Sequence, residues 1–242
     1  MAHYQQINFV EICSRYLANG CDFEKVLEVG SCDINGSIRG IVRAKQYIGI
    51  DVAPGPGVDQ VMLGQDADFS SNYFDIVISC ECFEHNEFWV ETFANMMRML
   101  KPGGVCIITC ASIVRGEHGT PRCVSSFSLT SGVLGENYYR NLDVSDFQRT
   151  RLLKGFSRYG FGKNIYSRDL YFVGIKKGGY CSLDLEGIFG EARSIRSEHG
   201  LSKAQMTVVK ISYFLRYLLA KMLGEAVYHN LAFIVKRSLG RV

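Results

Sequence analysis

The sequence contains no pair of cysteines separated by two residues, although it has nine cysteines. Zinc sites built on cysteine usually need two such pairs at a fixed spacing, so the sequence predicts no metal site. The count is odd, and many unpaired thiols fit a reducing compartment such as the cytoplasm. We therefore expect reduced, mostly buried cysteines.

Targeting and membrane segments are also missing. The N-terminus has no basic stretch followed by an apolar one, so no signal peptide is expected. The most apolar late segment, residues 206–223, is interrupted by Lys210, Arg216 and Lys221, which makes it a poor transmembrane span. With 47% hydrophobic and 21% charged residues, the composition excludes a low-complexity chain and is typical of a globular one.

The net charge of +3 is unevenly distributed along the chain. Residues 1–177 carry 18 basic and 19 acidic side chains, whereas residues 178–242 carry 9 and 5. A nucleic-acid-binding domain needs a basic surface to meet the phosphate backbone. Because the larger part of the chain lacks that excess, nucleic acid is not an expected partner.

Short apolar runs alternate with helix-like stretches over the first 177 residues. Near-continuous apolar strands that alternate with helices predict a parallel sheet covered on both faces. Strands are expected at residues 26–29, 47–51, 60–62, 74–79, 105–109, 156–165 and 170–175, and helices at 7–19, from near 37, at 87–100 and at 145–153. The last two strands should be an antiparallel pair because only a short break separates them. The predicted fold class is α/β: a doubly wound, seven-stranded, Rossmann-like sheet, mostly parallel with an antiparallel last strand, plus a C-terminal helical extension.

Two parts are expected in the chain. Residues 1–177 form the sheet domain, in which the glycine-rich stretch 111–142 is a lid or acceptor segment. Residues 178–242 form a basic, mainly helical extension, with an amphipathic helix at 202–223 and a second helix or strand at 225–237. The wide apolar stripe of the first helix needs a cover. Cover by the chain itself or by a homodimer is favoured over an anionic membrane surface, because few basic residues accompany the stripe.

Candidate ligand-binding residues stand at the carboxyl ends of the strands, where open α/β sheets bind ligands. Gly30, after the first strand, lets the backbone approach a ligand, and Glu28 can accept hydrogen bonds from a cationic amine. Asp51 ends the second strand, at the position that binds ribose hydroxyls in sheets of this kind. Asp66 follows the third strand and can accept from an adenine amine. Glu81 follows the fourth.

Five stretches, taken together, resemble the class I S-adenosylmethionine-dependent methyltransferase family, of the type 11 kind. They are residues 26–31 (VLEVGS), 47–51 (YIGID), the loop at Asp66, 74–79 (FDIVIS) and 100–104 (LKPGG). The family often has a Gly-x-Gly-x-Gly turn after the first acid, whereas only Gly30 and Gly36 remain here. The resemblance implies an enzyme with S-adenosylmethionine as cofactor and S-adenosylhomocysteine as product.

The resemblance also implies roles for single residues. Glu28 and Gly30 would hold the methionine end, and Ser31 and Asn35 would supply what the missing glycines do elsewhere. Asp51 would bind the ribose diol. The adenine and the methyl group would lie against later strand ends. The full set of implied cofactor-binding residues is Glu28, Gly30, Ser31, Asn35, Asp51, Val52, Gln65, Asp66, Ala67 and Ser79.

Catalytic candidates follow from the chemistry of the acceptor. The sulfonium already activates the methyl group, so the protein mainly aligns the two reactants and excludes water. A hydroxyl or amine acceptor can also require a general base, and histidine titrates closest to neutral pH. His85 follows the fourth strand and His118 lies in the lid, while Glu81 is a rival carboxylate.

The lid arginines suggest an acceptor class. Arg115, Arg122 and Arg140 would suit a phosphate, carboxylate or nucleotide sugar, although scattered surface arginines are the plainer explanation. The predicted function is O- or N-methyl transfer to a small polar or anionic acceptor, such as a sugar or a phosphorylated intermediate. Two alternatives stay open: a cofactor-binding scaffold without chemistry, and a nicotinamide-dependent oxidoreductase. The second would need a G-x-G-x-x-G turn, which this sequence lacks.

Overall fold

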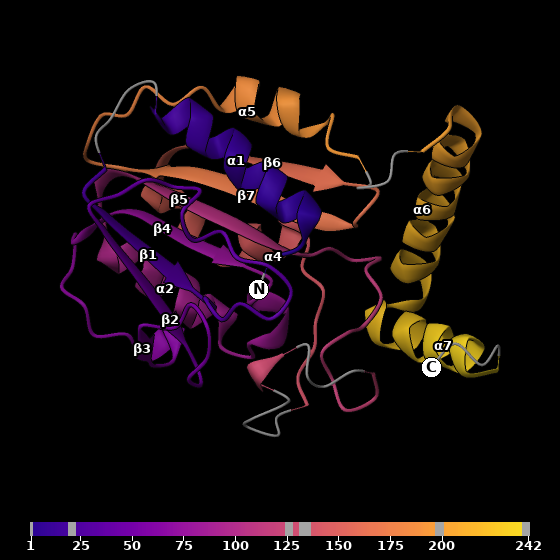
Figure 1. The fold of residues 1–242 in the computed structure, drawn as a ribbon. Helices are drawn as coiled ribbons and strands as arrows, with labels where there is room; N and C mark the ends of the chain where they lie inside the picture. Colours follow the sequence, from indigo (N-terminus) through magenta and orange to yellow (C-terminus); the bar gives the residue numbers. More distant parts are fainter. Residues whose placement is uncertain (1, 19–22, 124–127, 131–136, 197–200, 239–242) are drawn as a thin grey trace.

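A single sheet of seven strands forms the centre of the computed structural model, which describes residues 2–18, 23–123, 128–130, 137–196 and 201–238 (Figure 1). The strands lie in the order β3-β2-β1-β4-β5-β7-β6, and β7 runs antiparallel to both of its neighbours. They are β1 (Lys25–Val29), β2 (Gln46–Asp51), β3 (Gln60–Val61), β4 (Phe74–Cys80), β5 (Leu100–Ala111), β6 (Phe156–Asn164) and β7 (Asp169–Lys176). This topology confirms the predicted sheet. Strand order reverses between β1 and β4, which places a ligand crevice at their carboxyl ends.

Helices cover both faces of the sheet. They are α1 (Tyr4–Ala18), α2 (Trp89–Met99), α4 (Val144–Arg149) and α5 (Leu185–Ala192). Because side chains alternate along a strand, Val77 of β4 enters a core with α2 and α4, while Ile76 and Ile78 enter a core with α1 and α5. Figure 1 shows α1 and α5 side by side over one face. The sequence assigned α5 to the extension, but its Leu185 and Ile188 lie in the sheet's second core.

The prediction of a helix from near residue 37 is wrong. The chain between β1 and β2 is irregular, with a turn at residues 39–41. Gly36 has a φ of +139° and Gly40 a φ of +90°, and neither value fits a right-handed helix. Ile38 and Val42 are still fully or nearly fully buried against α1, so their apolar spacing reflects burial of a loop.

The helix expected at 145–153 is shorter than predicted. It ends at Arg149, and a 3-10 turn follows at Leu152–Gly155. Arg151, between them, has a φ of +61°, a left-handed conformation that stops a right-handed helix. Asp143 begins α4 with a capping box: it accepts from backbone N–H groups, and Asp146 caps the backbone of Asp143 in return.

The C-terminal extension forms two helices, α6 (Lys203–Leu223) and α7 (Glu225–Ser238). Tyr213, Tyr217 and Ala220 of the predicted stripe pack with Ile113 and Val114 of the sheet domain. The chain itself therefore covers part of the stripe.

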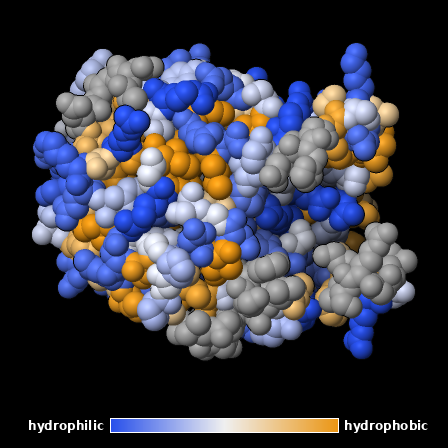
Figure 2. Space-filling model, viewed as in Figure 1, coloured by the Kyte–Doolittle hydropathy of each residue, from blue (hydrophilic) through white to orange (hydrophobic). Residues whose placement is uncertain are grey.

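The opposite side of α6 is apolar and exposed. Ile211, Leu215 and Leu219 are each about half exposed or more. The right side of Figure 2, over α6, shows such side chains in orange. Within the described residues, no helix is long and apolar enough to cross a membrane.

Candidate functional site

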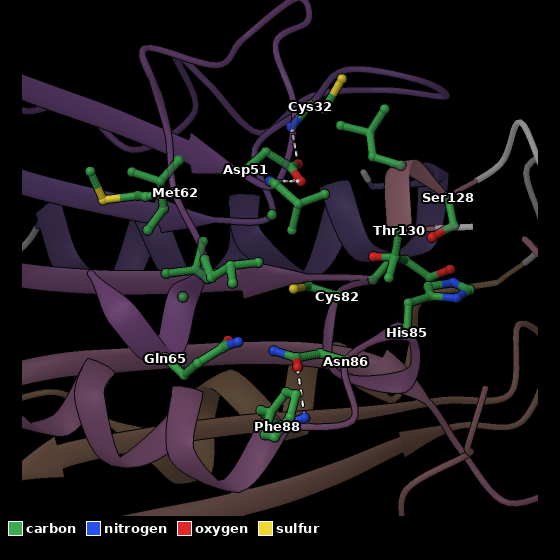
Figure 3. A pocket seen from close by; sticks show the side chains of 18 of the residues that line it. Cys32, Asp51, Met62, Gln65, Cys82, His85, Asn86, Phe88, Ser128 and Thr130 are labelled. Atoms are coloured by element: carbon green, nitrogen blue, oxygen red, sulfur yellow. Dashed lines mark hydrogen bonds between the residues drawn. The ribbon is translucent and has the colours of Figure 1, made fainter. Parts of the chain in front are cut away.

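A cavity opens at the carboxyl ends of β1, β2 and β4, where the strand order reverses (Figure 3). Of the predicted cofactor residues, it is lined by Gly30, Asp51, Val52 and Gln65. The catalytic candidates Glu81 and His85 also line it. Further lining residues that sequence reasoning missed are Cys32, Ile34, Met62, Leu63, Cys82, Asn86, Phe88, Ser128, Leu129 and Thr130.

Asp51 is held in a fixed orientation at the end of β2. Its Oδ2 accepts a hydrogen bond from the backbone N–H of Cys32 at 2.8 Å, and its Oδ1 accepts from that of Val52 at 2.8 Å. Figure 3 shows both contacts at the upper edge of the cavity. A carboxylate oxygen can accept more than one hydrogen bond, so both oxygens retain capacity for a vicinal diol.

The turn after β1 brings the backbone close to the cavity. Gly30 has a φ of +83°, and a Cβ there would lie 2.7 Å from the Cβ of Cys82. Only glycine fits between this turn and the segment after β4. The neighbouring Ser31 is buried and faces Gly49, away from the cavity lining, and Asn35 lines a second cavity instead.

The loop after β3 forms the opposite edge. Gln65 accepts a hydrogen bond from Thr92 at 3.2 Å, and Asn86 donates to the same hydroxyl at 2.8 Å. Both amides point toward the cavity in Figure 3. Asp66, predicted to meet adenine, is exposed and does not line the cavity, while Ala67 is buried in the core beneath it.

Two predicted cofactor residues are buried behind the cavity. Glu28 accepts a hydrogen bond from the Tyr47 hydroxyl at 2.8 Å, and burial raises its pKa to about 7. Ser79 donates to the backbone carbonyl of Val29 at 2.9 Å. Neither residue lines the cavity. In this conformation both support the strands that form its walls.

Glu81 is the centre of a charged cluster beyond β4. Its Oε2 lies 3.1 Å from Nε2 of His118 and 3.5 Å from Nη2 of Arg115, and Gln6 donates to its Oε1. Burial raises the pKa of Glu81, but Arg115, His118 and His3 more than offset it, so the pKa lies well below its usual range. Glu81 also has a φ of +49°. Such strain in a non-glycine residue is found preferentially at functional sites.

A second cavity of about 530 Å³ lies on the other side of Glu81. Its walls come from the start of α1, the lid segment and the turn before β7. It is lined by His3, Asn35, Glu81, Arg115, Gly116, Glu117, His118, Tyr166, Ser167 and Arg168. Glu81 is thus common to the two cavities, and His118 belongs to the second one.

Glu84 and His85 lie in a 3-10 turn, Phe83–His85, which begins two residues after Glu81. Burial and then His118 lower the pKa of His85 to about 3, so its ring is neutral at physiological pH. Burial and Glu81 raise the pKa of Glu84 well above its usual range. Gly119, with a φ of +62°, passes so close that a Cβ would lie 2.8 Å from Cε1 of His85.

The three lid arginines are already paired with carboxylates. Arg115 binds Asp169, Arg122 binds Glu117 and Arg140 binds Asp146. An anionic acceptor would have to compete with these carboxylates, so the structure does not support the prediction that these three arginines bind it. Arg168 and Arg216 differ: among the described residues, neither has a carboxylate within 4 Å.

Sequence reasoning missed His3, Asp169 and Arg168. His3 Nε2 lies 3.1 Å from Asp169 Oδ2. Burial lowers the pKa of His3, but the nearby carboxylates of Asp169 and Glu81 raise it by more. The net pKa of His3 is therefore above its usual value. The only signal in the sequence was the polar turn before the last strand, where Arg168 and Asp169 interrupt apolar residues.

The family comparison agrees with this geometry. Residues 27–108, from β1 to β5, match the family model described as a methyltransferase domain. This stretch is a methyltransferase domain, similar to those of class I S-adenosylmethionine-dependent methyltransferases. The resemblance inferred from the strand-end motifs is therefore confirmed, and so is the prediction that the protein is a methyltransferase.

Solved methyltransferase structures are similar to this chain. Phosphoethanolamine N-methyltransferase 2 of Haemonchus contortus, in complex with phosphomonomethylethanolamine and S-adenosylhomocysteine, is 14% identical with a TM-score of 0.51. The match covers 71% of this chain and 53% of that one. The same enzyme in complex with S-adenosyl-L-methionine gives the same values. A methyltransferase of Thermotoga maritima, described as a possible histamine N-methyltransferase, is 13% identical with a TM-score of 0.47, over 71% of this chain and 91% of that one.

This chain spans about half the length of the Haemonchus enzyme, and 49% of a carbon methyltransferase from CurJ. At 14% identity and a TM-score of 0.51, the likeness to the Haemonchus enzyme shows a shared fold. The comparison with curated proteins finds no significant match.

Proposed function

We propose that this methyltransferase binds S-adenosylmethionine in the first cavity and transfers its methyl group to a small polar, anionic acceptor in the second. The observation that carries the proposal is Glu81, which lines both cavities. A donor and an acceptor bound on either side of one side chain meet at that side chain. Alignment of the two reactants is the main catalytic contribution that such a reaction needs.

The first cavity fits the cofactor at each end. Asp51 offers an oriented carboxylate to the ribose diol, and Gly30 admits the methionine end close to the backbone. Gln65 and Asn86 offer amide groups to the adenine edge. S-adenosylmethionine would supply the electrophilic methyl group when bound there.

The second cavity fits an acceptor with a negatively charged group. Arg168 lines it, is partly buried, and has no carboxylate within 4 Å among the described residues. Burial and the nearby Arg216 lower its pKa, as expected for two cations that lack an anion between them. Arginine binds phosphate and carboxylate groups through two parallel hydrogen bonds. The Haemonchus enzyme, whose complex contains a small phosphorylated amine, supports this acceptor class.

The catalytic candidates take different places in this scheme. Glu81 and His118 form a hydrogen-bonded pair at the boundary of the cavities, where they can orient an acceptor hydroxyl or amine for O- or N-methylation. His85 is buried on the cofactor side. We assign Glu81 and His118 to contact with the acceptor.

Two variants test the proposal. Asp51→Ala should weaken S-adenosylhomocysteine binding, measured by calorimetry, by about 1–3 kcal/mol, since it removes charged hydrogen-bond acceptors. Asp33→Ala is the control, because this exposed aspartate lies in the loop between β1 and β2 and does not line the cavity. Transfer of labelled methyl from the donor into a panel of phosphorylated and carboxylated small molecules identifies the acceptor. Unchanged affinity in Asp51→Ala, or binding of NAD in place of S-adenosylhomocysteine, would contradict the assignment.

We also propose that a second copy of the chain covers the exposed face of α6. A wide apolar face on a helix needs a cover, and few basic residues accompany this one. Replacing Leu215 and Leu219 by Asp should convert the dimer to a monomer in analytical ultracentrifugation. A monomeric wild type that sediments with anionic liposomes would favour the membrane alternative. The odd number of cysteines in the sequence fits a reducing compartment, and we propose the cytoplasm.

A further inference from the structure

Three polar side chains converge at the boundary between the two cavities. Glu84 and His85 come from the 3-10 turn after β4, and His118 comes from the lid segment. One oxygen or nitrogen atom of each lies within 4.8 Å of those of the other two. The rings of His85 and His118 meet edge to face, with centroids 5.0 Å apart. These residue types at this separation are the ones that hold metal ions.

Glu84 and His85 present atoms to this cluster that have no hydrogen-bond partner, whereas both ring nitrogens of His118 have partners: Glu81 at Nε2, and Gly116 and Tyr139 at Nδ1. Within the described part of the chain, both ring nitrogens of His85 and Oε2 of Glu84 are buried and unpaired. His85 is 3% exposed and Glu84 is fully buried. Buried polar groups are almost always paired, and each unpaired one is costly. Three such atoms on two adjacent residues point to a ligand that binds lone pairs.

The charged groups around the cluster favour a bound cation. Glu81 lies beside it, with Oε2 at 3.1 Å from Nε2 of His118. Arg115, the nearest guanidinium to Glu81, is shared between Glu81 and Asp169. Among the described residues, no lysine or arginine nitrogen lies within 4 Å of a Glu84 oxygen. Buried charges in proteins are paired or coordinate metal ions, so a bound metal ion would stabilise the ionised form of Glu84 beside Glu81.

The backbone is arranged to keep the cluster together. Gly119 passes the ring of His85 at a distance that excludes any side chain, and this places His118 against His85. Glu84 Oε1 accepts from the backbone N–H of Ala111 at 2.9 Å, which fixes the carboxyl group and leaves Oε2 free. Preorganised ligands held by neighbouring hydrogen bonds are typical of metal sites.

We propose that Glu84, His85 and His118 bind a divalent metal ion, with Glu81 as the adjacent carboxylate. Two imidazoles and a carboxylate favour a first-row transition ion such as Zn²⁺, Mn²⁺ or Fe²⁺ over Mg²⁺, which prefers oxygen ligands. Three protein ligands leave further coordination positions open, as in catalytic metal sites. His85 lines the first cavity and His118 the second, so the ion borders both. If the proposed function holds, these open positions face the acceptor oxygen or nitrogen, where a Lewis acid would favour deprotonation.

Metal binding is tested on the full chain without cofactor. After removal of metals with a chelator, the wild type should bind one Zn²⁺ or Mn²⁺ per chain in calorimetry and elemental analysis. Glu84→Gln, which preserves shape, and His85→Ala should each weaken binding at least tenfold. His229→Ala, a buried histidine on α7 outside the cluster, is the matched control and should bind the ion as the wild type does.

A second control distinguishes the neighbouring cluster of His3, Glu81 and Asp169. Its His3→Ala variant should retain the ion. Loss of the ion in His3→Ala with retention in His85→Ala would overturn the proposal, as would a wild type that binds neither metal. Anomalous diffraction from crystals soaked in Mn²⁺ keeps the proposal testable if a variant fails to fold, since a peak away from His85 and His118 contradicts it. Calorimetry with S-adenosylhomocysteine is a separate measurement, so failure of the proposed function and failure of the metal site are distinguishable.

Discussion

Arg115 of the lid segment and Asp169 at the start of β7 form a buried ion pair, with Nη1 2.6 Å from Oδ1. Asp169 is fully buried and also faces His3. The pair ties the lid to the last strand of the sheet. It also gives the second cavity a wall that does not depend on a bound acceptor.

Asp169→Asn should destabilise the protein by about 3–5 kcal/mol, because it leaves Arg115 buried without its main partner. Urea unfolding measures the effect. Glu24→Gln is a suitable control, since Glu24 and its partner Lys45 are both more than half exposed and exposed pairs contribute little. A loss no greater than in the control would mean that the lid does not depend on this pair.

Gly119→Ala should displace the lid from His85. The added Cβ would lie 2.8 Å from the His85 ring, and the φ of +62° is strained for alanine. We expect at least a tenfold loss of methyl transfer together with a lower melting temperature. Gly190→Ala in α5 is the control: a Cβ there meets no atom within 4 Å, so stability should be unchanged or raised by up to about 1 kcal/mol. Normal turnover in Gly119→Ala would show that the lid can leave His85 without consequence.

Arg168→Met should raise the KM for an anionic acceptor at least tenfold and leave affinity for S-adenosylhomocysteine unchanged. The reason is that Arg168 lines the second cavity and not the first. Arg168→Lys should recover part of the loss, because it restores charge without the paired donors of arginine. Arg122→Met, which removes an arginine paired with Glu117, serves for comparison. Equal KM values in the Met and wild-type enzymes would remove Arg168 from the acceptor site.

Glu28 should make stability depend on pH. Its folded pKa of about 7 lies above the ordinary value of 4.5 for glutamate, so the folded state holds the proton more tightly. Its contribution is complete below pH 4.5 and is lost as the pH rises toward 7 and above. Glu28→Gln should remove this decline, which amounts to about 3 kcal/mol at most. Parallel pH dependence of unfolding free energy in the variant and the wild type would show that Glu28 titrates normally.

The sheet was predictable from the sequence because its signals are local. An apolar run followed by Gly30 or Asp51 identifies both a strand and the side of the sheet on which it ends. The loop after β1 misled the prediction, since Ile38 and Val42 have helical spacing but are buried from an irregular backbone. Strand position alone also did not separate lining residues from supporting ones. The side chain of Glu28 lies on the other face of the sheet from its two neighbours in β1, because side chains alternate along a strand.

The second cavity was beyond sequence reasoning for a different reason. His3, His118 and Asp169 are far apart in the chain and meet only after the sheet has formed. The search for metal ligands relied on cysteine pairs, whereas the cluster at His85 has no cysteine ligand. The pairing of the lid arginines with acids likewise depends on tertiary contacts. Among described residues it left Arg168 and Arg216 as cations without a carboxylate within 4 Å.

The short turn after β4 belongs to both the first cavity and the proposed metal site. Cys82 and His85 line the first cavity, and Glu84 and His85 belong to the cluster proposed to bind an ion, all within four consecutive residues. A shift of this turn changes both sites together. Occupancy of one site should therefore alter the affinity of the other, and by the same factor in either direction. S-adenosylhomocysteine titrated with and without Mn²⁺ would yield that factor as a coupling free energy, a property of the turn and not of either ligand alone.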